Sequence, residues 1–273
     1  MISDKVKEAI ISIFETAEYA ARMGGKILLD GFGTLQKDQI GLKGLGDFVT
    51  EMDRRSEDVI IAFIQQNFPD HAIQAEESGL VQRESEYRWV IDPLDGTANY
   101  VQGIPFYSVS IAVLKNNQPE YGIVYIPVLN EMFSAQKGKG VFLNGKPVGL
   151  SEKTEMDQAI LSTGFPWRSK SELGSFLKAF EAIFSQSAGI RRMGSAAIDL
   201  AYTACGRFDG FWEMALKPWD ISAGVLMVQE AGGIVTDFVG GDGYLKSGNV
   251  VAGKPEIHEK LVAATKVHLG HLS

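Results

Sequence analysis

The spacing of apolar residues changes along the chain, and these changes mark out its elements. In the N-terminal part, apolar residues recur every three or four positions, which is typical of amphipathic helices. We predict a first helix that is capped at Ser3 or Asp4 and ends near Leu29, just before two glycines. A second helix is expected over residues 54–67, where a Phe-Pro-Asp sequence follows its last turn.

Polar residues precede this second helix. The segment 37–46, which contains Lys43, is rich in polar residues and glycine and predicts a mobile loop or an irregular hairpin. Thr50 and Asp53 are both candidate helix caps. For Asp53 the sequence leaves two roles open, because a cap and a catalytic carboxylate fit its position about equally.

The middle of the chain alternates apolar and polar residues, the pattern of strands with one buried face. Asn144-Gly145 favours a tight type I′ turn between antiparallel strands. Helices followed by an antiparallel meander indicate an α+β fold. The strands expected here span 71–74, 89–92, 106–114, 120–126, 131–136 and 140–143.

The second half mixes helices and strands, after a polar stretch at about residue 150. We place a boundary there, which divides the chain into subdomains 1–150 and 151–273. Ser195 and Asp220 are the expected caps of two apolar helices. Phe176, Leu177 and Phe180 are expected to face inward. The expected strands span 159–163, 190–193, 208–212, 234–237 and 249–252, and the expected helices span 172–184, 196–204, 221–231 and 255–266.

Composition narrows the class of protein. The 273 residues, 45% hydrophobic and 22% charged, suit a globular protein with a sizeable core. The net charge of −8 argues against a general nucleic-acid or membrane-surface binder. Cys205 is the single cysteine, so no internal disulfide can form, and the mixed charges of residues 1–30 are unlike a signal peptide or a spanning helix. We therefore expect a cytoplasmic protein without direct nucleic-acid or membrane partners.

The stretch WVIDPLDGTANY, residues 89–100, carries the strongest chemical signal. Its apolar run predicts a buried strand, and Pro93, which lacks an N–H, predicts that the strand stops near Asp92. A second aspartate follows three residues on, and a helix can begin near Thr97. Two carboxylates there can hold a hard cation, while the amides of Gly96 and Thr97 can hold an anion. An isolated aspartate pair is usually a turn, but these flanking residues favour the site of a metal-assisted phosphatase.

Two further charged pairs are ambiguous from the sequence. Glu76 and Glu77 follow a short strand and precede a Ser-Gly turn, so they are either solvated surface or site acids. Arg191 and Arg192 are either a solvated or interface pair or a second anion contact. The second alternative would favour a bisphosphate such as fructose 1,6-bisphosphate.

Four segments together resemble the inositol monophosphatase family, the lithium-sensitive, magnesium-dependent sugar phosphatases. They are DFVTEMD at 47–53, AEESG at 75–79, WVIDPLDGTAN at 89–99, and WD at 219–220 followed by SAG and EAGG. The third, of the form W-x-x-D-P-x-D-G-T-x-N, is highly specific, and the resemblance spans almost the whole chain. It implies a layered α/β/α/β/α sandwich of the sugar-phosphatase type, with the site between two subdomains.

The resemblance also implies residue roles. Asp53 and Thr97 would orient and deprotonate the attacking water, and Ala196 and Glu213 would touch the sugar hydroxyls. The implied catalytic residues are Asp53, Glu76 and Thr97. The implied metal ligands are Glu76, Glu77, Asp92, the carbonyl of Leu94, Asp95 and Asp220. The expected substrate contacts, with Arg191 as the added anion contact, are Asp95, Gly96, Thr97, Arg191, Ala196, Glu213 and Asp220.

The implied cofactor is Mg²⁺, two or three ions, with Li⁺ as an inhibitor. All-oxygen ligands suit this hard cation, which can activate a water and neutralise charge on a phosphoryl group. The implied reaction is hydrolysis of inositol monophosphate or a related small sugar or polyol phosphate. Fructose-1,6-bisphosphatase, histidinol-phosphatase and 3′-phosphoadenosine 5′-phosphate phosphatase are alternatives. The family commonly forms homodimers, and some bacterial members associate with the transcription machinery, so a regulatory binding protein is the alternative from another class.

Overall fold

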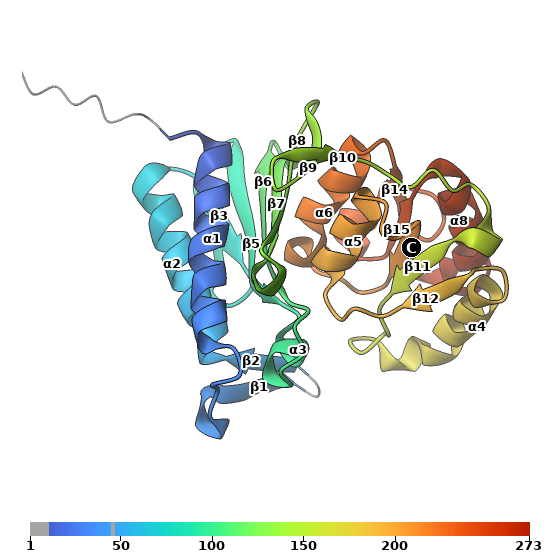
Figure 1. The fold of residues 1–273 in the computed structure, drawn as a ribbon, viewed down its shortest axis with the longest axis horizontal. Helices are drawn as coiled ribbons and strands as arrows, with labels where there is room; N and C mark the ends of the chain where they lie inside the picture. The colour runs from blue at the N-terminus through green and yellow to red at the C-terminus, as the bar shows by residue number, and fades with distance from the viewer. Residues whose placement is uncertain (1–10, 45–46) are drawn as a thin grey trace, which may run out of the picture.

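The computed structural model describes residues 11–44 and 47–273 (Figure 1). The first helix, α1, spans Ile13–Gly31 and is started by Ser12. The Ser12 hydroxyl accepts a hydrogen bond from the N–H of Glu15, and the Glu15 carboxylate accepts one from the N–H of Ser12, which makes a capping box. The predicted caps Ser3 and Asp4 lie outside the described residues. Residues 11 and 12 are not helical, so the prediction of one unbroken helix from those caps to Leu29 was wrong.

The second helix, α2, spans Glu51–Asn67 and starts earlier than predicted. Thr50 and Asp53 form another capping box, in which the Thr50 hydroxyl accepts from the N–H of Asp53 and the Asp53 carboxylate accepts from the N–H of Thr50. Thr50 is therefore the cap, and Asp53 lies inside the first turn. Before it, β1 (Ile40–Gly44) pairs with β2 (Asp47–Thr50) as the irregular hairpin that was one of the two predictions for 37–46.

The first large sheet has eight strands in the order β10-β9-β8-β7-β6-β5-β3-β4. Its neighbours pair antiparallel except β3 and β5, which are parallel. The predicted meander is confirmed, and Asn144 and Gly145 both have positive φ, as a type I′ turn requires. The strands are β3 (Ala72–Ala75), β4 (Gly79–Val81), β5 (Tyr87–Asp95), β6 (Ser108–Lys115), β7 (Gln118–Ile126), β8 (Glu131–Gln136), β9 (Gly140–Leu143) and β10 (Lys146–Val148).

Strand β5 continues beyond the proline that was expected to end it. Asp92 pairs with Ser110 and Asp95 pairs with Ser108, so β5 uses one more residue than β6 over this interval. This β-bulge accommodates Pro93, because the extra residue interrupts the ladder there. The prediction of a stop near Asp92 was therefore wrong. The bulge brings both aspartates to the carboxyl end of one strand.

The second sheet has five strands in the order β12-β11-β13-β15-β14. β11 is parallel to β12 and β13, whereas β15 is antiparallel to β13 and β14. Its strands are β11 (Ile160–Thr163), β12 (Gly189–Arg191), β13 (Gly210–Glu213), β14 (Ile234–Thr236) and β15 (Val250–Gly253). The remaining helices are α3 (Thr97–Val101), α4 (Leu173–Phe184), α5 (Ala196–Ala204), α6 (Pro218–Glu230), α7 (Tyr244–Ser247) and α8 (Pro255–Leu269).

Two second-half predictions needed correction. Helix α6 begins at Pro218, so Asp220 occupies its first turn and is not the cap. Proline suits that position because its missing N–H would have had no helical partner. On α4, Phe176 is fully buried as predicted, but Leu177 is 48% exposed and does not face inward.

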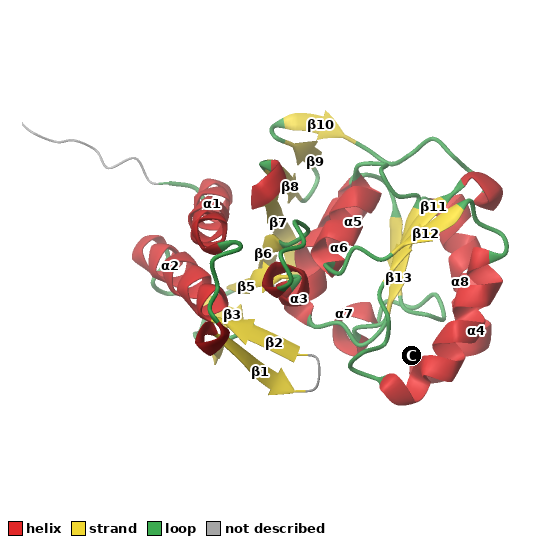
Figure 2. Cartoon of the chain, turned by 60° about the horizontal axis from the view of Figure 1, so that its bottom comes forward, coloured by secondary structure: helices red, strands yellow, loops and turns green. Residues whose placement is uncertain are grey.

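The elements form five layers, α/β/α/β/α, in an α+β fold (Figures 1 and 2). Helices α1 and α2 cover one face of the eight-stranded sheet, and α5 and α6 lie between the two sheets. Helices α4 and α8 cover the far face of the second sheet. One hydrophobic cluster joins Val124 of the first sheet, Val225 of α6 and Phe211 of the second sheet. Helices that follow residue 150 thus cover strands that precede it. The division into subdomains 1–150 and 151–273 therefore stays a prediction.

None of the helices in the described ranges is long and apolar enough to cross a membrane.

Candidate active site

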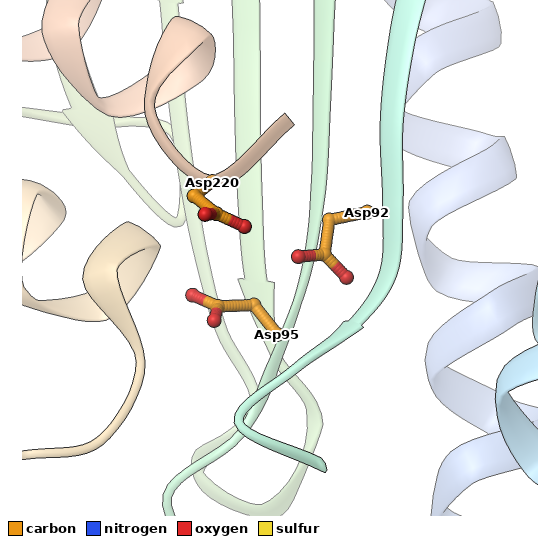
Figure 3. A group of neighbouring side chains, drawn as sticks. All are labelled: Asp92, Asp95 and Asp220. Atoms are coloured by element: carbon orange, nitrogen blue, oxygen red, sulfur yellow. The ribbon is translucent and has the colours of Figure 1, made fainter. Parts of the chain in front are cut away.

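Three aspartates from two distant parts of the chain meet at the junction of the two sheets. Asp92 and Asp95 end strand β5, and Asp220 lies in the first turn of α6. Each offers one carboxylate oxygen, and these oxygens lie within 4.8 Å of one another. Figure 3 shows the three carboxyl groups converging on a common space. The fold therefore brings together acids that are more than a hundred residues apart in the sequence.

The protein uses one oxygen of each aspartate to orient it. Asp92 Oδ1 accepts from the N–H of Leu94 at 3.0 Å. Asp95 Oδ2 accepts from the Ser195 hydroxyl at 2.6 Å and from the N–H of Ala197 at 2.8 Å, both at the start of α5. Asp220 Oδ2 accepts from the N–H of Lys217 at 2.8 Å. Among the described residues, no hydrogen-bond donor contacts the second oxygen of Asp95 or of Asp220, and Asp92 lies against the carboxyl group of Glu76.

The electrostatics of the cluster fit a bound cation. Burial, and then the negative charge of neighbouring acids, raises the pKa of Asp92 well above its usual value and that of Asp95 to about 7. Burial also raises the pKa of Asp220, although Arg168 opposes that shift. Buried carboxylates that repel one another are costly unless a cation or protons neutralise them. Because all the donors are oxygens, a hard ion such as Mg²⁺ matches this set.

The aspartates line a cavity of about 200 Å³. Of the residues predicted for the site, those that line it are Glu76, Asp92, Leu94, Asp95, Gly96, Thr97, Ala196, Glu213 and Asp220. Asp53, Glu77 and Arg191 do not line it. The separate roles of these residues stay predictions, but the cavity holds acids, amides and hydroxyls from both halves of the chain.

Asp53 lies behind the cavity and contacts it through Thr97. The Thr97 hydroxyl can donate a hydrogen bond to Asp53 Oδ1 at 3.1 Å or to the carbonyl oxygen of Leu94 at 3.0 Å. Thr50 holds the other Asp53 oxygen through its N–H at 2.8 Å and its hydroxyl at 2.6 Å. Burial raises the pKa of Asp53 to about 7, while the hydrogen bonds from Thr50 oppose that rise. The same carboxylate thus completes a capping box and faces Thr97.

Lys43 of the β1–β2 hairpin connects the two adjacent glutamates. Its ammonium group is 3.0 Å from Glu76 Oε1 and also pairs with Glu77. Burial lowers the pKa of Lys43, but hydrogen bonds and charges from the two glutamates outweigh this and raise it overall. Burial raises the pKa of each glutamate, with Lys43 opposing. Lys43 therefore supplies the positive charge that keeps these acids together.

Helix α3 begins at the edge of the cavity with Gly96 as its cap. Gly96 has a φ of 94°, and a Cβ there would lie 3.0 Å from the carbonyl oxygen of Phe106. Only glycine suits this left-handed backbone against another chain segment. Opposite, a Cβ at Gly164 would overlap the Glu213 carboxylate, so that glycine makes room for it. Burial, and then the charge of Asp220, raises the pKa of Glu213 to about 8.

Two arginines border the cavity, but Arg191 is not one of them. Arg191 is exposed, and its Nη1 donates to the carbonyl oxygen of Ile190 at 3.2 Å. Arg192 and Arg168 line the cavity instead, and Arg168 Nη1 lies 3.3 Å from Asp220 Oδ2. The geometry does not support the expected substrate contact at Arg191. Arg192, the next residue, lines the cavity instead.

Two further supporting residues had no role in the site assigned from the sequence. Ser195 was identified only as a helix cap, yet its hydroxyl also orients Asp95. Glu57 is buried on α2, and its carboxylate accepts from the N–H groups of Glu77 and Ser78 at 2.9 and 2.8 Å. It therefore fixes the turn that carries Glu76. The capping pattern correctly indicated Ser195 as a cap, but not its bond to Asp95, because contacts between distant elements have no local pattern.

Comparison with known proteins agrees with this arrangement. The family model described as "Inositol monophosphatase family" matches residues 11–269. The Nus factor SuhB of Escherichia coli (strain K12) is 44% identical over 245 residues, which cover 89% of this chain and 92% of that protein. The inositol-1-monophosphatase of Mesorhizobium japonicum is 41% identical over 248 residues, which cover 90% of this chain and 93% of that protein.

A solved structure is also similar. The crystal structure of extragenic suppressor protein suhB from Bartonella henselae superposes with a TM-score of 0.90 at 38% identity. The match covers 93% of this chain and 98% of that chain. The family match over residues 11–269 includes both sheets and every segment that lines the cavity.

Proposed function

This chain belongs to the inositol monophosphatase family, and from that premise we propose that it is a Mg²⁺-dependent phosphatase. Its substrate would be inositol monophosphate or a related small sugar or polyol phosphate, and its products the alcohol and inorganic phosphate. The observation that carries the proposal is the convergence of Asp92, Asp95 and Asp220 on one cavity, within 4.8 Å of one another. Burying such a cluster is costly unless cations or protons neutralise it, and its all-oxygen donors suit a hard cation.

The acids of the cavity would hold the metal ions. Asp92, Asp95, Asp220 and Glu76, with the carbonyl oxygen of Leu94, supply oxygen ligands from both halves of the chain. Glu77 would contact an outer ion or its waters. When bound, Mg²⁺ would neutralise charge on the phosphate and acidify a water molecule. Bound cations would also offset the negative charge of the lining acids, which otherwise repels a phosphate ester.

Thr97 and Asp53 would manage the proton of the attacking water. The Thr97 hydroxyl can accept a hydrogen bond from water while it donates to Asp53 Oδ1 at 3.1 Å. Asp53, with a pKa raised to about 7 by burial, can take up a proton near neutral pH, as a general base requires. Thr50 holds its other oxygen, so the carboxylate cannot turn away from Thr97.

The remaining lining residues would bind the substrate. The amides of Gly96 and Thr97, at the start of α3, would donate to phosphate oxygens. Ala196 and Glu213 lie across the cavity, and the Glu213 carboxylate can accept from a sugar hydroxyl. The site would therefore orient a phosphate and a polyol at the same time.

A turnover screen tests this function. The purified protein would be assayed on inositol monophosphate, fructose 1,6-bisphosphate, histidinol phosphate and 3′-phosphoadenosine 5′-phosphate, with Mg²⁺ and with EDTA. We expect hydrolysis with Mg²⁺ only, and the preferred ester would assign the substrate. Absence of hydrolysis of every ester would overturn the proposal.

A regulatory binding role in transcription is the second candidate. The name Nus factor, carried by the E. coli relative at 44% identity, favours it. Asp95→Asn separates the two roles, because the amide removes a metal ligand from inside the cavity without altering the surface. A variant that loses hydrolysis but restores the cellular phenotype of a deletion would support the binding role. Loss of both would support the phosphatase alone. A homodimer, expected from the family, would be tested by light scattering.

A further inference from the structure

A second hollow lies beside the catalytic cavity and differs from it in charge. It measures about 370 Å³ and is bordered by the loop after β11, the loop between β13 and α6, and α7. Its lining includes Arg168, Lys217 and Lys246, together with the hydroxyl residues Ser169 and Ser247. Among the residues that the structure describes, no acid lines it. We call this hollow the basic pocket.

The cations of the basic pocket are poorly neutralised. Within the described ranges, Lys217 and Lys246 form no ion pair within 4.0 Å. Arg168 alone pairs with an acid, Asp220. Three like charges around one hollow repel one another, and an anion between them relieves that repulsion. In a protein of net charge −8, this is a local field of opposite sign.

The basic pocket and the catalytic cavity share a wall. Arg168 and Leu216 line both of them. The Arg168 guanidinium lies 4.2 Å from the centre of the Trp167 ring and 3.3 Å from Asp220 Oδ2, and its side chain is 25% exposed. A group that enters the basic pocket therefore meets an arginine already held against an aspartate of the cluster.

We infer that the basic pocket binds a second anionic group, a phosphate or a similar oxyanion, beside the scissile phosphate. The group comes either from the substrate itself, as the second phosphate of a sugar bisphosphate, or from a separate small anion. The guanidinium can donate two parallel hydrogen bonds to an oxyanion, and the two lysines and two hydroxyls supply further donors. The substrate source rests on the proposed function, whereas anion binding does not.

Anion binding is tested on the metal-free protein with inorganic sulfate. Lys217 and Lys246 line the basic pocket but not the catalytic cavity, so a saturable response to sulfate in EDTA that depends on these two lysines reports the basic pocket. We expect millimolar sulfate, at ionic strength matched with NaCl, to raise the melting temperature of the wild type. The response should fall at least severalfold in the double variant Lys217→Gln/Lys246→Gln and in Arg168→Gln. Lys178→Gln, which changes an exposed lysine on α4, is the matched control and should respond as the wild type.

The source of the anion is tested by kinetics. Fructose 1,6-bisphosphate and fructose 1-phosphate differ only in the second phosphate, so the ratio of their kcat/KM values isolates its contribution. If the substrate supplies the anion, we expect this ratio to fall tenfold or more in the double variant but not in Lys178→Gln. If a separate anion binds, the ratio stays constant and sulfate changes the rate for fructose 1-phosphate only in proteins with an intact basic pocket.

Two results distinguish the possible failures. A sulfate response that is absent in the wild type, or unchanged in the double variant Lys217→Gln/Lys246→Gln, overturns the inference. A normal sulfate response that is lost in this variant, in a protein that hydrolyses no phosphate ester, supports the basic pocket and overturns the proposed function.

Discussion

Asp95 connects the two halves of the site, because it lies at the end of β5 and is held by residues at the start of α5. Its Oδ2 accepts from Ser195 and Ala197, so Oδ1 is the oxygen left for a cation. In Asp95→Asn the amide oxygen can keep both hydrogen bonds, and the NH₂ group then faces the cation. We expect turnover to fall roughly a thousandfold or more. The melting temperature in EDTA should not fall, because the variant removes one repelling charge. Steady-state assays and thermal unfolding check this, and a near-wild-type rate would contradict the metal assignment.

The single hydroxyl of Ser195 caps α5 and also orients Asp95. It donates to Asp95 at 2.6 Å and accepts from the N–H of Ile198, which starts α5. We expect Ser195→Ala to cost about 1 kcal/mol of stability as a lost cap and to lower turnover by about 10- to 100-fold by releasing Asp95.

The control for this prediction is Ser12→Ala, which removes the cap of α1 at a point that does not line the cavity. It should lower stability by a similar amount without a matching loss of turnover. Equal turnover in the two variants would mean that Ser195 acts only as a cap. Chemical unfolding and steady-state kinetics provide both readouts.

At the scale of elements, the β1–β2 hairpin contributes an internal cation to an acidic site. Lys43 pairs with Glu76 and Glu77, so a metal ion that uses those glutamates has to displace its ammonium group. We expect Lys43→Gln to lower the melting temperature in EDTA, because two partly buried acids lose their counter-charge. We also expect Mg²⁺ to bind severalfold more tightly, since no ammonium competes with it.

Isothermal titration and thermal shift with Mg²⁺ measure both effects of this change. Lys26→Gln, which removes an exposed ion pair with Asp30 on α1, is the matched control and should alter neither quantity. Unchanged or weaker Mg²⁺ binding in Lys43→Gln would show that the lysine does not compete with the ion.

Elements with a clear period or a turn signal could be predicted from the sequence. The bounds of β8, β9 and α5 agree with those expected from alternation, glycine turns and the Ser195 cap. Errors arose where one residue type has two uses. Aspartate is a common helix cap, but Asp220 lies in the third position of α6, after Pro218. Proline usually ends a strand, but the bulge in β5 accommodates Pro93.

The acids of the candidate site could be found because they lie in specific motifs. Asp92, Asp95 and Asp220 were all identified before their convergence was known. The contacts that support them could not be found, because the bond from Ser195 to Asp95 and the bonds from the Glu76 turn to Glu57 join separate segments of the chain. Arg168 was missed for the same reason. From the pair Arg191 and Arg192 we selected Arg191 as the anion contact, but Arg192 is the one that lines the cavity.

At the scale of the whole molecule, a bound cation would join β5 of the first sheet to α6 between the sheets. Ligands that bind only the folded state stabilise it in proportion to their affinity. We therefore expect millimolar Mg²⁺ to raise the melting temperature by several degrees over EDTA. Asp220→Asn should abolish most of this rise, because it removes the only aspartate that α6 contributes to the cluster. An equal rise in that variant would place the ion elsewhere.

The pH dependence of the metal-free protein follows from the same buried acids. Burial raises the pKa of Asp95 to about 7 and of Glu213 to about 8, from ordinary values of 3.8 and 4.5. The folded state therefore holds these protons more tightly than the unfolded chain. The stability that they contribute is complete below the ordinary pKa values and is lost as the pH rises through 7 to 8.

In EDTA, the melting temperature should accordingly fall between about pH 5.5 and pH 8.5 by several degrees. With Mg²⁺ the fall should be much smaller, because the ion replaces the protons as the counter-charge and binds more tightly when they have left. Thermal unfolding over this range, with and without Mg²⁺, measures the difference. A melting temperature that rises with pH in EDTA would mean that these carboxylates are already ionised and neutralised by the protein itself, and the reason to expect a metal ion between β5 and α6 would be lost.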